Sequence, residues 1–67
     1  MRISYNKLWK MLIDKNMKKS DLREKAGISS ASLAKLGKGD NITTDVLLRI
    51  CKAIDCRIED ILETVRD

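Results

Sequence analysis

Apolar residues recur at helical spacing along most of the chain, in five groups separated by short polar breaks. The members of the first group share one apolar helical face: Tyr5, Leu8, Trp9, Leu12 and Ile13. This group predicts a helix within residues 1–16, and the next two groups predict shorter helices over 18–26 and 30–36. A fourth helix is expected from 43 to 55 and a fifth from about 57. Apolar and polar residues alternate almost nowhere, so we expect an all-α fold.

The segment from 17 to 39 predicts two short helices joined by a tight turn. Leu22 and Ala26 lie on one face of the first of these helices, and Gly27 follows as a residue that can adopt the left-handed conformation at a helix end. Ser29 is expected to cap the second helix by accepting a backbone hydrogen bond. Helix, glycine turn and capped helix form the helix-turn-helix arrangement, whose second helix can enter a DNA major groove. Taken alone, the pattern fits an αα-hairpin used only for packing equally well.

The formal charge of +4 is unevenly distributed along the 67 residues. Residues 1–38 contain ten Lys or Arg against three Asp or Glu, whereas residues 39–67 contain four against seven. The positive charge therefore accompanies the predicted helix-turn-helix and the helix before it, as a phosphate-binding surface requires. A solvated lysine-rich surface is the alternative interpretation.

The remaining composition excludes several classes of site. With no histidine and only Cys51 and Cys56, the chain has too few ligands for a structural zinc site, and no metal or cofactor is expected. The two cysteines, on either side of a helix end, are not obviously placed to bridge, and reduced thiols fit a cytoplasmic protein. No apolar run approaches membrane-spanning length, so no membrane association is expected. Trp9 and Tyr5 lie within an apolar stripe, which favours a core role over base stacking.

Four parts of the sequence, in this order, resemble the Xre/Cro-type helix-turn-helix family of small bacterial and phage repressors. They are LREKAGI at 22–28, SSASLAKL at 29–36, Gly39, and TTDVLLRICKAIDCRIEDIL at 43–62. The resemblance covers nearly the whole chain. It implies one domain over residues 1–67, a compact five-helix phage-repressor-like DNA-binding domain with the helix-turn-helix at its second and third helices.

The resemblance also implies the residues that meet DNA. The residues expected to contact bases, from the recognition helix, are Ser30, Ala31, Ser32 and Lys35, and Ser32 can contact phosphate instead. The residues expected to contact phosphates are Lys19, Ser29, Lys38 and Asn41. A lysine can donate to the O6 and N7 atoms of guanine, and an alanine methyl group can contact thymine, whereas serines discriminate poorly between bases.

Four positions depart from the pattern of that family. Arg23 replaces a small residue, Gly37 replaces a polar helix former, Lys18 replaces a hydroxyl N-cap, and Asp55 replaces a glycine after the fourth helix. These differences affect the local geometry at helix ends and helix crossings more than the fold.

The function implied is sequence-specific binding of double-stranded DNA by a small transcriptional regulator, in particular a repressor with the third helix in the major groove. A homodimer is expected, because one copy covers about half a site. Its interface would use the C-terminal helix, through residues that fit the core equally well: Ile58, Ile61, Leu62 and Val65.

Two other functions make different demands on the sequence. An antitoxin-like protein-binding module would need an exposed apolar strip on the C-terminal helix. An enzyme is not expected, because the chain has neither histidine nor a phosphate-binding glycine loop, and Cys56 has no evident base partner. No small-molecule ligand is expected.

Overall fold

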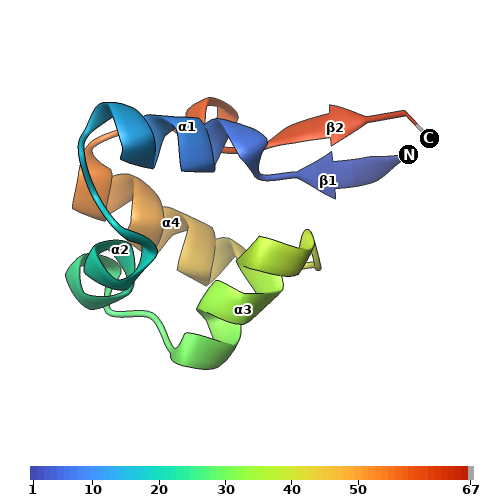
Figure 1. Ribbon diagram of the computed structural model, residues 1–67. Helices are drawn as coiled ribbons and strands as arrows, with labels where there is room; N and C mark the ends of the chain where they lie inside the picture. The colour runs from blue at the N-terminus through green and yellow to red at the C-terminus, as the bar shows by residue number, and fades with distance from the viewer. Residues whose placement is uncertain (67) are drawn as a thin grey trace.

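The computed structural model describes residues 1–66, which form four α-helices, one short 3₁₀ helix and a small two-stranded sheet (Figure 1). In chain order these are β1 (Arg2–Ser4), α1 (Asn6–Asp14), α2 (Lys19–Ala26), α3 (Ser30–Lys38), α4 (Thr44–Ile54), the 3₁₀ helix η1 (Ile58–Asp60) and β2 (Glu63–Val65). The fold is therefore a mostly helical helix-turn-helix fold, and the expectation of five helices in an all-α fold is wrong in its detail.

Both errors in the predicted elements lie at the ends of the chain. The first helix begins at Asn6, inside the predicted range of 1–16, but the residues before it form a strand that the sequence pattern does not predict: Arg2–Ser4 is β1, which pairs antiparallel with β2. Arg2 lies opposite Val65 in this register. Figure 1 shows the two strands side by side, projecting beyond the helices.

The expected C-terminal helix is a single 3₁₀ turn followed by a strand. The turn is closed where the Asp60 carboxylate accepts a hydrogen bond from the backbone N–H of Arg57, at 2.9 Å. Beyond it, Glu63–Val65 forms backbone hydrogen bonds with β1 instead of continuing a helix. Apolar residues at 58, 61, 62 and 65 fit a helical stripe, but they fit a turn that leads into a strand equally well.

One hydrophobic core joins all four helices. Its fully buried side chains are Leu8, Leu22, Leu36, Ile50 and Ile61. Tyr5 is also buried and Trp9 is half-buried, which confirms the core role predicted for the two aromatic residues. Because each helix contributes to this core, α2 and α3 are held at a fixed angle to one another and to α4.

The turn between α2 and α3 forms as the sequence predicts. Gly27 is left-handed, with φ of 66°, and the N–H of Ile28 donates to the carbonyl of Arg23 at 3.2 Å. The Ser29 hydroxyl caps α3 by accepting from the N–H of Ser32 at 3.1 Å. At its other end α3 continues through Gly37 and stops at Gly39, whose φ is 74°.

Within residues 1–66, none of the helices is both long enough and apolar enough to cross a membrane.

Candidate nucleic-acid interface

The outer face of α3 is an exposed ridge of small and basic residues. The α3 ridge consists of Ser30, Ala31, Ala34, Lys35 and Lys38, all of them exposed. The opposite face of the helix packs inward through Leu36, which is buried, and Leu33, which is half-buried. Three of the four residues predicted to contact bases therefore project from one surface, and the apolar residues at 33 and 36 fix which surface that is.

A groove runs along one side of this ridge, between α3 and the start of α4. The residues that line this α3/α4 groove are Ser29, Ala31, Ser32, Lys35, Asn41, Ile42, Thr43 and Val46. Five of the eight predicted contact residues thus meet in one place. The hydroxyl of Ser32, at the edge of the groove, is already in a hydrogen bond with that of Ser29, at 3.1 Å.

The loop between α3 and α4, which forms the other wall of this groove, has a hydrogen bond near each of its ends. The Tyr5 hydroxyl donates to the backbone carbonyl of Asp40 at 3.2 Å. Burial raises the pKa of Tyr5, and the nearby Asp40 carboxylate raises it further, so the phenol stays protonated as the donor. At the other end, the Thr43 hydroxyl caps α4 by accepting from the N–H of Val46 at 3.3 Å. Asn41 is therefore presented from a loop with little freedom.

The other three predicted residues lie outside this groove. Ser30 is on the α3 ridge, at the start of the helix. Lys38 lines a separate recess between α3 and the first residues of α1. Lys19 begins α2, and its Nζ lies 4.5 Å from the centroid of the Trp9 ring, a cation–π contact. The predicted phosphate contacts are thus spread over both sides of α3.

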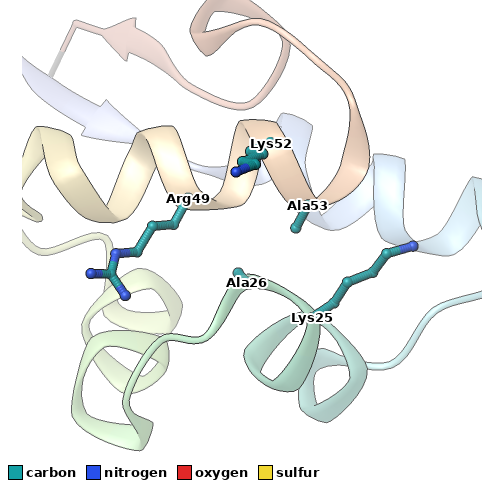
Figure 2. Close-up of a pocket in the computed structure, with 5 residues that line it drawn as sticks. All are labelled: Lys25, Ala26, Arg49, Lys52 and Ala53. Atoms are coloured by element: carbon teal, nitrogen blue, oxygen red, sulfur yellow. The ribbon is translucent and has the colours of Figure 1, made fainter.

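A third hollow, between α2 and α4, contains basic residues that the prediction did not include (Figure 2). Ala26 and Ala53 face each other across it, and Lys25, Arg49 and Lys52 stand around it. Figure 2 shows the side chains of Lys25 and Arg49 extending away from each other, so their charges do not converge on one ligand. The hollow is therefore not assigned as an anion site.

Arg49 instead connects α4 to the helix-turn-helix. Its Nε donates to the Asp45 carboxylate at 3.0 Å, and its Nη1 donates to the carbonyl of Gly27 at 3.3 Å. The second contact holds the turn from which α3 begins. Sequence reasoning missed this residue, although its spacing of four from Asp45 was a signal that the two would meet on one helix.

The two cysteines are closer than the sequence suggested. The N–H of Cys56 donates to the carbonyl of Cys51 at 3.0 Å, and both thiols are free. Burial raises the pKa of Cys56 to about 12, and the neighbouring Cys51 thiol contributes through its charge and a hydrogen bond. Across residues 1–66, no cluster of three or more His, Cys, Asp or Glu side chains could hold a metal ion.

Comparison with known proteins decides what kind of domain this is. The model of the Cro/C1-type helix-turn-helix DNA-binding domain matches residues 7–67. The chain belongs to this family. As a Cro/C1-type domain it is a DNA-binding domain of the transcriptional-regulator class, which confirms the resemblance found in the sequence.

Two relatives of the Cro/C1-type domain agree with this assignment. It is 42% identical over 55 residues to the uncharacterized HTH-type transcriptional regulator YozG of Bacillus subtilis (strain 168). That match covers 79% of this chain and 66% of the relative, just under two thirds of its length. The crystal structure of the transcriptional regulator VanUg superposes with a TM-score of 0.94 at 52% identity, covering 98% of this chain and 88% of that one.

Proposed function

We propose that this Cro/C1-type domain recognises a specific double-stranded DNA sequence with α3 in the major groove, and that it represses transcription by occupying that site. The observation that carries the proposal is the α3 ridge. It is the exposed face of a helix capped at both ends, and its residues apart from two lysines are serine or alanine. A helix with such a face can enter a major groove about 12 Å wide.

Lys35 is the main base-reading residue in this proposal. Its side chain is long enough to donate to guanine from the middle of the ridge, beside the α3/α4 groove. Ala31, one turn earlier, offers a methyl group to thymine. Ser30 and Ser32 add hydrogen bonds that discriminate less between bases.

The few base contacts do not fix the position of the protein along the DNA by themselves. Contacts to the DNA phosphate backbone fix it. Ser29 and Asn41 line the α3/α4 groove, and they are assigned to phosphates on that side. Lys19 and Lys38 are assigned to phosphates on the other side. Both lysines are exposed, so each can reach a phosphate without leaving a buried charge behind.

The functional form is proposed to be a homodimer on a palindromic operator, as a cytoplasmic regulator. A symmetric dimer places two recognition helices in successive major grooves about 34 Å apart. The interface expected on a C-terminal helix is not retained, because residues 58–65 form a 3₁₀ turn and a strand, and Ile61 is fully buried. The protein-binding alternative required an apolar strip on that same helix, so no observation favours it.

The test is in vitro selection of binding sites from fragmented genomic DNA, at a low and at a near-physiological salt concentration. We expect a two-fold symmetric motif that persists at the higher salt, with half-sites about one helical turn apart. Sedimentation of the protein with the selected duplex then gives the number of copies bound. Binding that is free of any motif and lost at the higher salt would refute sequence-specific regulation.

A further inference from the structure

Gly37 lies inside α3 although nothing in the fold requires a glycine there. Only Gly27 and Gly39 among the three glycines have a positive φ. A Cβ added at Gly37 would meet no atom within 4 Å beyond its own helix backbone and chain neighbours. Glycine is among the least favourable residues for a helix interior, so the fold alone would be more stable with almost any other residue at this position.

Gly37 opens onto the recess that separates α3 from the start of α1. This α1/α3 recess is lined by the end of α3, by β1 and by the first turn of α1: Arg2, Ile3, Ser4, Tyr5, Asn6, Trp9, Leu36, Gly37, Lys38 and Gly39. Lys38 contributes an ammonium group and Asn6 an exposed amide. Trp9 in its wall carries the Lys19 ammonium 4.5 Å from its ring, so this cation stands at the border in addition to Arg2 and Lys38, which line the recess. Such a concentration of donors fits an anion.

The α1/α3 recess and the α3/α4 groove lie on opposite flanks of the α3 ridge. Gly37 and Lys35 are two residues apart, which is about 200° around a helix axis. Lys35 faces α4 and its loop, whereas Gly37 faces α1 and β1. Each wall of a DNA major groove is a phosphate backbone, so a helix inserted in the groove has one strand on each flank.

We propose that the α1/α3 recess receives a backbone phosphate of the DNA strand opposite to the one that meets the α3/α4 groove. Lys38 and Asn6 are the donors, and Gly37, which lines the recess, leaves room there that a longer side chain would take up. The inference rests on the proposed insertion of α3 in the major groove. It adds Asn6 and Gly37 to the interface, and neither residue was predicted from the sequence.

Substitution at Gly37 separates this role from a structural one. In Gly37→Gln the long side chain fills the recess, and glutamine is a good helix former, so we expect an unchanged or higher melting midpoint. We also expect the affinity for the selected duplex to fall about tenfold, as the loss of one hydrogen bond to a charged group predicts. Gly37→Ala should raise the midpoint and lower the affinity less. The matched control is Leu48→Gln, which places the same side chain on the exposed face of α4, and its affinity should equal that of the wild type.

The phosphate itself is identified with duplexes in which one phosphate at a time is replaced by a neutral methylphosphonate. We expect one position whose replacement weakens the wild type but has little further effect on Gly37→Gln or Asn6→Ala. Wild-type affinity in Gly37→Gln, or the same set of sensitive phosphates in all three proteins, would overturn the proposal. Binding of inorganic phosphate at Asn6, without any DNA phosphate whose replacement distinguishes the wild type from the variants, would also overturn it.

The insertion of α3 is tested separately by Lys35→Ala, which leaves the recess intact. If Lys35→Ala relaxes the base preference while Gly37→Gln binds normally, the recess proposal fails and the proposed function stands. If Lys35→Ala leaves the preference unchanged, α3 does not read the bases, and the proposed function fails first.

Discussion

Lys35 shows how much of the proposed recognition depends on one side chain. Its neighbours on the α3 ridge at 30, 31 and 34 are serine or alanine, which have short side chains. Lys35 alone combines a long donor with a place beside the α3/α4 groove. Base preference should therefore be concentrated at a single base pair in each half-site.

Replacing Lys35 with alanine should weaken specific binding by about 1–3 kcal/mol and relax the preference at one base pair. Binding to a panel of single-substitution duplexes measures both effects. Lys52→Ala removes the same charge from the hollow between α2 and α4, outside the α3/α4 groove, and serves as the control. A uniform loss across the panel, equal to that of the control, would show that Lys35 contributes only charge.

The cysteine pair belongs to the end of α4, where the chain turns out of the helix. Asp55 is left-handed there, and the bond from the N–H of Cys56 to the carbonyl of Cys51 spans it. In this type of helix ending, the side chains at these two positions commonly touch as an apolar contact. The sequence shows the cysteines on either side of a helix end, but it does not show that the ending itself brings them together.

Stability should fall at alkaline pH partly because of Cys56. The pKa of this thiol is raised from 9.0 to about 12, so the folded state holds its proton more tightly than the unfolded state does. The resulting stabilisation is complete below pH 9 and is lost as the pH rises from 9 towards 12. Urea unfolding of wild type and Cys56→Ala at about pH 7 and about pH 10.5 measures this. The wild type should lose more stability between these two values, and parallel losses would contradict the assignment. The pKa of Tyr5 is also raised, but Tyr5 is present in both proteins, so its contribution to the loss of stability cancels in the comparison.

Among the elements, those predicted correctly have local signals at both ends. The turn between α2 and α3 needed only Gly27 and Ser29, and α4 needed the cap at Thr43, so these boundaries follow from residues a few positions apart. The strands have no such signal. Arg2–Ser4 becomes a strand only because Glu63–Val65, at the other end of the chain, supplies its hydrogen-bond partners. Pairing over that separation cannot be read from periodicity.

The end of α4 can be made more stable. Asp55 has φ of 53°, a left-handed conformation that glycine adopts without strain and that costs energy for a residue with a Cβ, although less for aspartate than for most. Asp55→Gly should therefore raise the free energy of unfolding. Relief of the backbone strain contributes about 0.5–1 kcal/mol, and the greater entropy of glycine in the unfolded chain offsets part of it. Urea denaturation measures the change, and Asp14→Gly, at the last residue of α1, where φ is not positive, should destabilise instead. A loss of stability in Asp55→Gly would mean that the carboxylate supports the turn.

The candidate site was predictable to the extent that it lies on one element. Ser29, Ala31, Ser32 and Lys35 belong to α3 and its cap, and their positions relative to one another follow from helix geometry. Arg49 and the α1/α3 recess were missed, because each depends on how two distant segments pack. The role of Gly37 in particular was invisible, since the sequence shows a helix-weakening residue but not the space beside it.

For the molecule as a whole, the distribution of charge sets how binding depends on salt. The basic first part of the chain, residues 1–38, contains α1, α2 and α3, whereas the part after residue 38 is mildly acidic. Non-specific attraction to DNA should therefore act mainly through these three helices, and it should weaken as salt screens it.

Lys19→Ala should lower affinity for all duplexes by a similar factor and reduce the slope of log affinity against log salt by about 1. Titrations of a specific and an unrelated duplex at several salt concentrations give both quantities. Lys25→Ala, at the opposite end of the same helix, is the charge-matched control. A loss confined to the specific duplex would be inconsistent with a phosphate contact.

The position of Lys19 over Trp9 gives the protein an intrinsic optical probe. Trp9 is the only tryptophan in the chain, and it is half-buried beside a cation proposed to bind DNA. When the ammonium group shifts towards a phosphate, the indole loses a charge 4.5 Å from its ring, and its emission should change in wavelength or intensity. Occupancy can then be followed by unlabelled fluorescence titration, with Lys19→Ala as the protein whose signal should stay flat. An equal emission change in Lys19→Ala would trace the signal to another part of the interface.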